Sequence, residues 1–434
     1  MTATSGHADQ LLQQHLAAAV READLSDVEP DLPELTSARK RARGDARAGS
    51  RLATVALVQD ADLLRWVYDP PPATWRPRPR RRGVSIEDED VVHAFQFLEV
   101  PPNEIVGRLE ALDLSMTPAR GLRQWTAGQP AAVAGRVKGK VLLLVHGTFS
   151  RGDMYFEELN ATPEGQAFLA DCEARYDAVV TFDHPTLALS PWLNALDLAT
   201  ATADWPGPID VICHSRGGLV VSWWLLIASP PVKRVVFVGS PLEGTSLAAP
   251  AGLKRALDLL GNYARAIGTM GNTAATVVPM LAAAGGLMKI IGSALSFGAR
   301  VPLLDAGVAI VPGLAAQSRV SNNFELQRLF LGEWRKRHEL YAIESNYEPD
   351  RVDDPWWQFW KHFRSVPGRL IEAGADAIFD GPNDLVVDTA SMSRLGQSSA
   401  VVKARRLEFT GSVHHCAYFR QPKTFDFLSS ALGT

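Results

Sequence analysis

The segment VICHSRGGLV, residues 211–220, contains the residue best suited to chemistry in this chain, Ser215. A short apolar run leads into the serine, and two glycines and a second apolar run follow it. On a tight turn between a strand and a helix, a serine projects its hydroxyl from the carboxyl edge of a sheet. The N–H groups at the start of the helix there favour developing negative charge. The pattern predicts a nucleophile for acyl transfer, with a purely structural turn as the alternative.

The turn departs from the strict G-x-S-x-G pattern at one position. Because such a turn is crowded, small residues are needed two places before and two places after the serine. Gly217 fills the second place, but Cys213 stands in the first, where glycine is usual. We expect cysteine to be small enough to fit.

A second segment, LLLVHGTFS at residues 142–150, strengthens the prediction. It is an apolar run that ends in a glycine upstream of the serine. In α/β-hydrolases the loop at this place lends a backbone N–H to the oxyanion hole, and Gly147 would let that backbone approach the substrate closely. We expect the N–H groups of Thr148 and Arg216 to be the two donors, and His146 to hold the loop rather than act as the base.

The general base is expected near the C-terminus, because the triad in this fold runs along the chain as serine, acid and histidine. The segment EFTGSVHHCAYF supplies His414 and His415, the only histidines after residue 370. Histidine suits the role because its ordinary pKa lies close to neutral pH. At this point both histidines are candidates.

The acid must lie between the serine and these histidines, and it must be buried enough to orient an imidazole. The segment GPNDLVVD offers Asp384, in a loop that precedes an apolar run. Asp376, Asp380 and Asp388 are the reserves, although a turn or cap carboxylate explains each of them more simply. Upstream of Ser215, Asp183 and His184 follow a predicted strand too early for triad members, so we interpret them as loop-stabilising.

The elements that must position these residues alternate along the chain from about Gly139. This alternation predicts a parallel sheet with crossover helices, in the α/β class. The predicted strands are residues 140–147, 177–185, 208–215, 232–241, 338–346 and 405–411, and the predicted helices are 168–175, 193–203, 216–228 and a last helix after His415.

The rest of the chain is expected to add to this core. Residues 1–50 predict an N-terminal arm that is helical or partly disordered, and residues 51–434 predict one α/β-hydrolase domain. Within that domain, residues 51–135 would supply additional N-terminal strands, at 51–70 and 91–100. Residues 246–320 are rich in Ala, Gly, Leu and Val. They predict a helical cap that would cover an apolar site and touch lipid surfaces transiently, or else helices that simply pack on the sheet.

Composition sets the outer limits on function. Of the 434 residues, 46% are hydrophobic and 21% charged, and the formal net charge is -4, which gives no reason to expect nucleic-acid binding. The three cysteines have no paired spacing, so neither a disulfide framework nor a zinc site is predicted. The N-terminal residues do not resemble a signal peptide, and glycines and Pro279 interrupt the uncharged stretch at 266–288. We expect a soluble cytoplasmic protein.

The ordered series HGTFS, FDHPTLALSPWLNA, CHSRGG, VGSPLEGTSLA, GPNDLVV and HHCAYF resembles bacterial lipase-like serine hydrolases of the α/β-hydrolase superfamily. The resemblance implies a mostly parallel central sheet with helices on both faces. It implies a triad of Ser215, Asp384 and His415, since two small residues and an aromatic pair follow His415 as in lipase-like sequences. Beside Cys213, the sequence departs from the family at Leu385, where many lipases have glycine.

Together these patterns predict a serine hydrolase that cleaves a carboxylic ester by an acyl-enzyme mechanism. The substrate would be a small-molecule or lipid ester, and the chemistry requires no metal or organic cofactor. The alternatives are hydrolysis of another acyl bond, an amide or thioester, and a catalytically inactive fold that serves as a binding or effector module. Cys213 and the unexplained N-terminal region keep the second alternative open.

Overall fold

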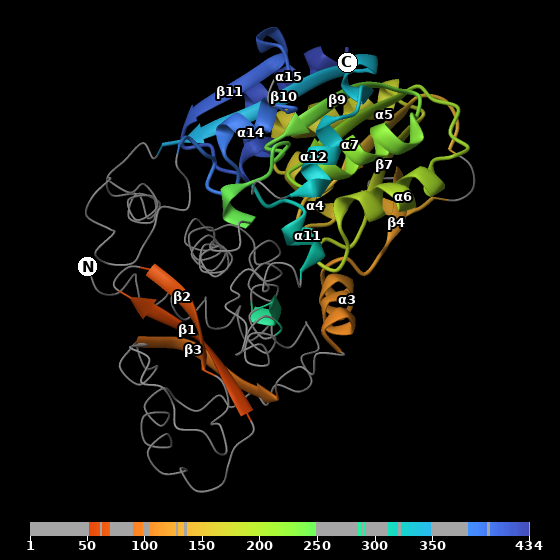
Figure 1. The fold of residues 1–434 in the computed structure, drawn as a ribbon. Coiled ribbons are helices and arrows are strands. Elements are labelled where there is room, and N and C mark those ends of the chain that lie inside the picture. The colour runs from red at the N-terminus through yellow and green to blue at the C-terminus, as the bar shows by residue number, and fades with distance from the viewer. Residues whose placement is uncertain are drawn as a thin grey trace, which may run out of the picture. The chain divides into compact units, whose positions relative to one another are not determined.

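A computed structural model describes residues 104–126, 129–133, 137–248, 285–287, 290, 311–319, 323–348, 381–396 and 400–433, together with the backbone of three strands between residues 52 and 98. The chain divides into two compact units (Figure 1). The first comprises Met1–Met116, Ala251–Ile310 and Pro355–Lys361, and the second comprises Thr117–Pro250, Val311–Asp354 and His362–Thr434. The candidate site residues all belong to the second unit.

The first unit contains a three-stranded antiparallel sheet with the order β2-β1-β3. Its strands are β1 (Leu52–Asp60), β2 (Leu63–Asp69) and β3 (Asp90–Leu98). The strands predicted at 51–70 and 91–100 are therefore present, and they form a sheet of their own. Helix α3 (Ile105–Met116) also belongs to this unit. The predicted arm at residues 1–50 lies outside the described residues.

The second unit is built on an eight-stranded sheet with the order β11-β10-β9-β8-β6-β7-β4-β5. Neighbours pair in parallel from β11 to β7, whereas β4 joins antiparallel to β7 and β5 antiparallel to β4. The strands are β4 (Gly121–Thr126), β5 (Gln129–Ala132), β6 (Val141–Val145), β7 (Ala178–Asp183), β8 (Ile209–His214), β9 (Val232–Val238), β10 (Glu339–Tyr347) and β11 (Arg406–Gly411). All six parallel strands were predicted from the sequence.

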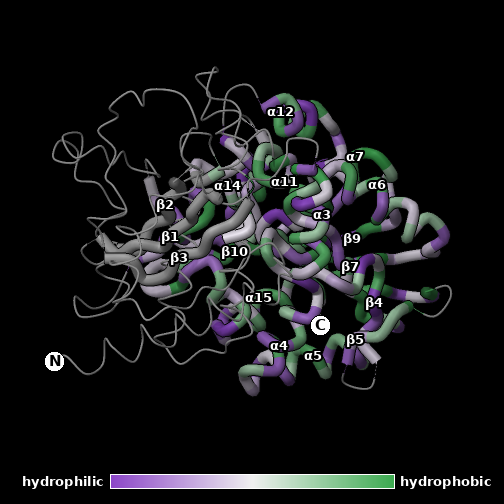
Figure 2. The backbone as a smooth tube through the Cα atoms, turned by 90° about the horizontal axis from the view of Figure 1, so that it is seen from below, coloured by the Kyte–Doolittle hydropathy of each residue, from purple (hydrophilic) through white to green (hydrophobic). Residues whose placement is uncertain are grey.

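Helices cover both faces of this sheet, because its parallel strands are apolar on both sides. Along β6, Leu143 and Val145 pack with α6 (Pro191–Ala201) and α7 (Gly217–Ala228). The alternate residues Leu142 and Leu144 pack with the helices of the other face. Those helices are α4 (Asp153–Leu159), α5 (Pro163–Arg175) and the C-terminal α15 (Pro422–Leu432). The hydropathy of these elements can be followed along the backbone in Figure 2.

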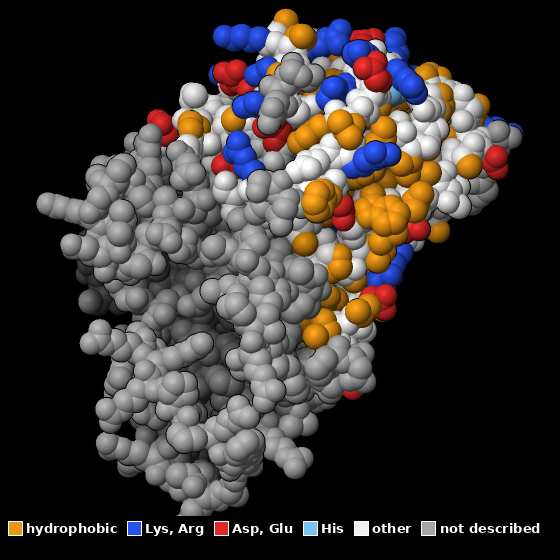
Figure 3. Space-filling view, in the orientation of Figure 1, with side chains coloured by type: hydrophobic (Ala, Val, Ile, Leu, Met, Phe, Trp, Pro, Cys, Tyr) orange, Lys and Arg blue, Asp and Glu red, His pale blue; other side chains and the backbone are white. Residues whose placement is uncertain are grey.

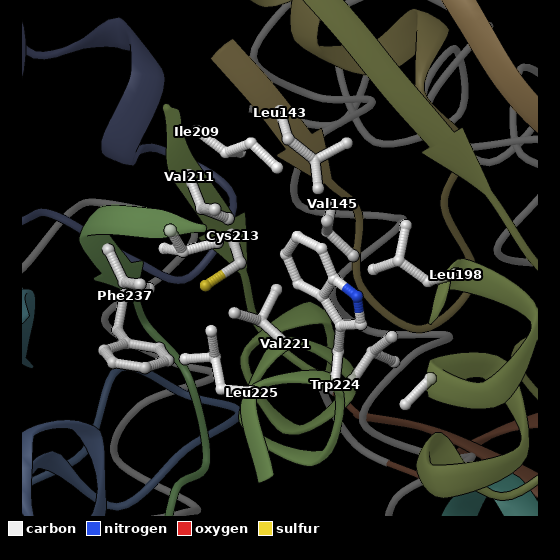
Figure 4. Close-up of a cluster of buried hydrophobic side chains, with 14 of the residues drawn as sticks. Leu143, Val145, Leu198, Ile209, Val211, Cys213, Val221, Trp224, Leu225 and Phe237 are labelled. Atoms are coloured by element: carbon white, nitrogen blue, oxygen red, sulfur yellow. The ribbon is translucent and has the colours of Figure 1, made fainter. Parts of the chain in front are cut away.

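The core on the α6–α7 side is centred on Trp224, whose side chain is fully buried. Figure 4 shows this indole among the side chains of Leu143, Val145 and Leu198. Burying aliphatic and aromatic side chains of this size contributes roughly 1.5–3 kcal/mol each. The core therefore holds α7, and with it the turn at its N-terminus, firmly against the sheet.

The order of the strands creates a switch point at β6, which has β7 on one side and β8 on the other. In open α/β sheets, ligands bind beyond the carboxyl ends of the strands at such a point, because the loops there diverge. The His146-Gly147 loop follows β6, and Ser215 follows β8. The unit has the α/β-hydrolase fold, and its topology brings both predicted segments to this edge.

The predicted cap at 246–320 is described mainly at its two ends. The ends meet, because Thr245 forms a bridge with Ser318, and because Asp388 accepts hydrogen bonds from Ser246 and faces Arg319 at 3.4 Å. The short elements here and nearby are η3 (Ser246–Ala248), α11 (Pro312–Ala315), α12 (Phe324–Phe330), η5 (Trp334–Arg337), α14 (Thr389–Ser393), η6 (Lys403–Arg405) and η7 (Tyr418–Arg420). Most of the insertion lies outside the described residues, so the cap stays a prediction.

Among the helices that the structure describes, none has both the length and the apolar character needed to cross a membrane.

Candidate active site

Ser215 sits on a sharp turn between β8 and α7 with a φ of 52°. This is the left-handed region, which residues with a side chain rarely adopt, and such strain persists only where the surroundings impose it. Here the serine N–H donates to the carbonyl of Val238 at 2.9 Å, and its own carbonyl accepts from Gly218 N–H at 3.0 Å. The neighbouring strand and the first turn of α7 thus fix the backbone on both sides of the hydroxyl.

Two glycines let the nucleophile turn and the loop after β6 fit closely together. A Cβ on Gly217 would lie 2.3 Å from the carbonyl oxygen of Val145, which is backbone and cannot move aside cheaply. A Cβ on Gly147 would lie 2.6 Å from the Cβ of Ser215 and 3.2 Å from its Oγ. The loop that was predicted to line the oxyanion hole therefore packs directly against the serine.

Cys213, the departure from the strict motif, causes no conflict with the turn. Its side chain is fully buried in the core on the α7 side, among Val221, Leu225 and Phe237 (Figure 4). The thiol faces the carbonyl of Val236 at 3.5 Å. A small residue is accommodated here because the side chain enters the core rather than the turn.

His415 and Asp384 form a buried pair. The Nδ1 atom of His415 lies 2.7 Å from Oδ2 of Asp384, and the backbone N–H of His415 donates to the Asp384 carbonyl at 3.0 Å. The structure thus brings together the predicted acid and the favoured histidine. The ring of His414 lies edge-on to that of Tyr347, at a centroid distance of 6.4 Å.

The loop around Asp384 is shaped to keep the carboxylate ionised. Its Oδ1 accepts the N–H groups of Val386 at 3.1 Å and Val387 at 2.7 Å. Burial acts to raise the pKa of Asp384, but the His415 ring, the bond to it and these N–H groups outweigh burial and hold the pKa below its usual value. Leu385 has a φ of 79°, so the position where many lipases have glycine does require left-handed backbone, which leucine adopts here.

His214 links the nucleophile turn to the base. Its Nε2 lies 3.1 Å from the carbonyl oxygen of His415, and the two rings have centroids 4.7 Å apart. Because a carbonyl only accepts, Nε2 must carry the proton. Burial and the neighbouring His415 lower the pKa of His214 to about 3, so this ring is neutral at neutral pH.

The loop after β9 closes the same arrangement. A Cβ on Gly239 would lie 3.3 Å from both Asp384 Oδ2 and His415 Cε1. Gly239 directly follows Val238, whose carbonyl binds the N–H of Ser215. Ser215 and the His415–Asp384 pair therefore lie against neighbouring backbone at one edge of the sheet.

The predicted oxyanion loop is held by an imidazole. His146 Nε2 accepts the backbone N–H of His184 at 3.2 Å, so the proton sits on Nδ1, which donates to the Gly147 carbonyl at 3.0 Å. In a planar trans peptide the N–H of Thr148 points opposite to that carbonyl. The His146 ring thereby sets the direction of the Thr148 N–H, the loop-holding role expected from the sequence.

The other predicted donor, Arg216, opens helix α7. Its guanidinium is buried, and Nη2 donates to the carbonyl of Leu189 at 2.6 Å and to Oδ1 of Asn194 at 2.7 Å. The Thr148 hydroxyl bonds with Gln317, whose Nε2 lies 3.1 Å away. The far end of the insertion therefore contacts the loop that carries the first donor.

The remaining sequence candidates have other places. Asp183 accepts the N–H of Gly152 and faces Arg123 at 3.4 Å, a loop-stabilising role as predicted. Asp388 fastens the ends of the insertion instead of meeting a histidine. Asp376 and Asp380 lie outside the described residues. Within the described residues, no group of three or more His, Cys, Asp or Glu side chains is placed to hold a metal ion.

Sequence reasoning missed two residues that touch the acid–base pair, His214 and Tyr418. The Tyr418 hydroxyl donates to Asp384 Oδ2 at 2.8 Å. His214 adjoins the serine, so its position was a signal for a supporting role. The aromatic pair after His415 was noticed only as a family feature, and nothing in the sequence indicated that the hydroxyl reaches Asp384.

Comparison with solved structures gives similarities of fold alone. The mature lipase BlEst2 of Bacillus licheniformis is 15% identical with a TM-score of 0.39, and the match covers 71% of this chain and 98% of that one. Lipase 1 of Pelosinus fermentans is 15% identical with a TM-score of 0.41, covering 68% and 98%. A probable hydrolytic enzyme of Pseudomonas aeruginosa is 18% identical with a TM-score of 0.38, covering 73% and 95%.

No curated protein sequence matches the chain. A family model does match, over residues 114–433, which include the whole eight-stranded sheet and every candidate site residue. Because this match spans most of the chain, the protein belongs to the family described as Domain of unknown function (DUF7379).

Proposed function

We propose that the protein is a serine hydrolase that cleaves a carboxylic ester through an acyl-enzyme. Ser215 is the nucleophile, His415 the general base and Asp384 the acid that orients the base. The observation that carries this proposal is the buried 2.7 Å pair of His415 and Asp384, formed next to a strained turn that presents a serine. Nucleophile, base and orienting acid are the parts that acyl transfer requires.

Before the proposed reaction, His415 carries its proton on Nδ1 and donates a hydrogen bond from there to the Asp384 carboxylate. The lone pair on Nε2 is then free to accept a proton. His415 Nε2 takes the hydroxyl proton as Ser215 Oγ attacks the ester carbonyl. The tetrahedral intermediate collapses, His415 returns the proton to the departing alcohol, and the acyl group remains on Ser215. Water, deprotonated by the same ring, then releases the carboxylic acid and restores the serine.

The oxyanion of each tetrahedral intermediate would be stabilised by the backbone N–H groups of Thr148 and Arg216. The contact of Gly147 with Ser215 supports this assignment, because it places the loop against the nucleophile. So does the bond from His146 to the Gly147 carbonyl, which fixes the peptide in advance. Loss of one such donor typically costs about 3 kcal/mol in transition-state stabilisation.

Exposed apolar side chains on α6 and α12 support an ester with a hydrophobic acyl chain or a lipid as substrate. Hydrophobic side chains gather over α6 and α12 on the face seen in Figure 3. Among them, Phe324 is 76% exposed, and Trp192 and Leu196 are also exposed. Exposed apolar side chains in one region are typical of surfaces that meet lipids or apolar ligands. Transient lipid contact through the insertion belongs to this proposal.

A fluorophosphonate probe tests the proposal, because it phosphonylates only an activated serine. We expect wild-type protein to be labelled on the peptide that contains Ser215, and Ser215→Ala to lose the label. Ser222→Ala is the matched control: this buried serine on α7 donates to the carbonyl of Gly218 in its own helix, and its loss should leave labelling unchanged. Labelling that survives in Ser215→Ala, or none in folded wild type, would refute the assignment.

A substrate panel separates the acyl bonds. We expect chromogenic esters to be hydrolysed at least tenfold faster, in kcat/KM, than the matching amides and thioesters. Faster turnover of an amide or thioester would move the activity to that bond while keeping the triad. Binding without turnover of any member of the panel would favour the inactive binding module.

A further inference from the structure

The carboxylate of Asp384 has a second side-chain partner besides the candidate base. The hydroxyl of Tyr418 donates to Oδ2 at 2.8 Å, and this is the same oxygen that lies 2.7 Å from His415 Nδ1. The other oxygen, Oδ1, is occupied by the N–H groups of Val386 and Val387. The imidazole and the phenol therefore share one oxygen atom of a fully buried acid.

The packing leaves the Tyr418 ring little freedom to move. The side chain is fully buried, and its ring contacts those of His415 and His214 edge-on, each at a centroid distance of 6.3 Å. A Cβ on Gly239 would lie 2.7 Å from Cε2 of the ring, so glycine is required there. The backbone after β9 is thus shaped around the tyrosine.

Packing explains the aromatic ring but not the hydroxyl. A phenylalanine would fill the same volume without burying a polar group, and a buried hydroxyl is costly unless it is hydrogen-bonded. Among the residues that the structure describes, the hydroxyl has one other hydrogen-bonding neighbour, the weak acceptor Met392 Sδ, at 3.5 Å. The hydroxyl is therefore best explained by its bond to Asp384.

We propose that Tyr418 is a positioning residue that tunes the acid: by occupying part of Oδ2, its hydroxyl limits how strongly Asp384 holds the His415 proton and fixes the carboxylate in the plane of the ring. This inference rests on the proposed function. The geometry supports this role because the Tyr418 hydroxyl and the His415 Nδ1–H both donate to Asp384 Oδ2. Electron density that this oxygen shares with one donor is less available to the other.

The ionisable groups that interact with this cluster come from several elements. Among the described residues they include His214 at the end of β8, Glu344 on β10, His414 and Cys416 beside the base, Arg420 in η7, and Asp384 itself. Tyr418 cannot be the group that titrates in the neutral range. Burial and the adjacent Asp384 raise the pKa of its hydroxyl well above the usual value. Its effect must therefore appear in the titration of its neighbours.

The test compares Tyr418→Phe with wild type in the pH dependence of kcat/KM for a chromogenic ester. Without the hydroxyl, the Asp384 carboxylate interacts more strongly with protonated His415. The midpoint of the acid limb of the kcat/KM profile should therefore move to higher pH by about 0.5 unit, the equivalent of a modest hydrogen bond. The plateau kcat should fall about threefold to tenfold, because the carboxylate is less well oriented. KM should stay unchanged.

Tyr176→Phe is the matched control. This tyrosine also donates to Oδ2 of a buried aspartate, Asp210, at 2.8 Å, but at the opposite end of β8 from Ser215. Tyr176→Phe should lose about as much stability as Tyr418→Phe but keep the wild-type pH profile of kcat/KM. An acid limb that stays in place in Tyr418→Phe, or that moves equally in both variants, would overturn the inference.

A second measurement does not depend on turnover. In the ¹H NMR spectrum, the His415 Nδ1 proton should resonate further downfield in Tyr418→Phe than in wild type, because its bond to Asp384 strengthens. If wild type neither turns over esters nor reacts with the fluorophosphonate, the proposed function fails, and the NMR shift still decides on Tyr418. An unmoved resonance would refute the role of the hydroxyl.

Discussion

At the level of single residues, neighbouring groups fix the backbone conformation, orientation and ionisation of the candidate triad. Ser215 is held in left-handed backbone, so its hydroxyl stands on a turn that the adjoining strands do not allow to relax. Asp384 is fully buried yet has a lowered pKa, because the adjacent His415 ring and the hydrogen bonds to both carboxylate oxygens outweigh burial. His415 is then oriented from one side by this acid and held at its backbone by His214.

Acid should destabilise the protein through His214. Its pKa is about 3 in the folded protein against 6.5 as the ordinary value, so the unfolded chain takes up a proton that the folded chain excludes. The free energy of unfolding should therefore fall as the pH drops from about 6.5 towards 3, by about 1.4 kcal/mol per pH unit from this group. Urea unfolding measured from pH 4 to pH 8 gives this slope.

His214→Gln keeps a donor near the position of Nε2 but cannot titrate. Below pH 6, the slope of its unfolding free energy against pH should therefore be smaller than that of wild type by the equivalent of about one proton. Ser215→Ala is the control, because it alters the same turn without removing a titrating group. Equal slopes for wild type and His214→Gln would show that this ring is not kept neutral by burial.

At the scale of elements, the fit between the loop after β6 and the start of α7 determines whether the site forms. Gly147→Ala would place a Cβ 2.6 Å from the Cβ of Ser215. We expect fluorophosphonate labelling to fall at least a hundredfold, since a displacement of about 1 Å suffices for such a loss. Stability should fall by about 1–3 kcal/mol, the usual cost of an added methyl group in a packed site, because the Ser215 Cβ is fixed to its turn and the loop after β6 must move instead.

Gly381→Ala is the control for this prediction. It is an exposed glycine just before the acid loop, and in the described part of the chain no residue other than its direct neighbours lies within 4 Å of the position of a Cβ. Its labelling rate should equal that of wild type. If Gly147→Ala were labelled as fast as Gly381→Ala, the close packing of the oxyanion loop on the serine would not matter for catalysis.

The central parallel strands β6, β7 and β8 could be predicted because each is a largely apolar run that is buried on both faces. The antiparallel strands β4 and β5 lie in the region 51–135, where additional strands were expected, but the sequence analysis specified only those at 51–70 and 91–100. In β4 nearly every residue is half-buried, so no alternation appears in GLRQWT, and β5 carries a proline at the sheet edge. The site was predictable where one segment contains both the residue and the strand and turn that position it, as at Ser215. The Tyr418–Asp384 contact could not be predicted, because it joins two separate segments.

At the scale of the whole second unit, the two edges of the sheet have different tasks. The carboxyl edge carries Ser215, His415 and Asp384. The amino edge carries a buried charge cluster in which Asp210 accepts from Tyr176 and faces Arg234 at 3.4 Å. Arg234 also donates to the carbonyl of Leu432 at 2.5 Å, which ties the end of α15 to the sheet.

Arg234→Met should therefore cost stability without affecting chemistry. It removes a charged partner from the buried Asp210 and leaves the Leu432 carbonyl without this donor, for which we expect a loss of about 2–4 kcal/mol. Urea midpoints measure the loss, and the fluorophosphonate labelling rate of the folded fraction should stay at the wild-type value. Lys233→Met, at the exposed neighbouring position, should change neither quantity. A slowed labelling rate in Arg234→Met alone would contradict this division between the two edges.

The proposed mechanism requires that Ser215 carries the acyl group during turnover. Rapid mixing of the protein with a chromogenic ester, acid quenching within the first turnover and mass spectrometry of the peptides measure this directly. We expect a mass increase equal to the acyl group on the peptide that contains Ser215. This acylated peptide should accumulate with the burst of released alcohol and be absent in Ser215→Ala. An acyl group on another residue, or ester hydrolysis that continues undiminished in Ser215→Ala, would contradict it.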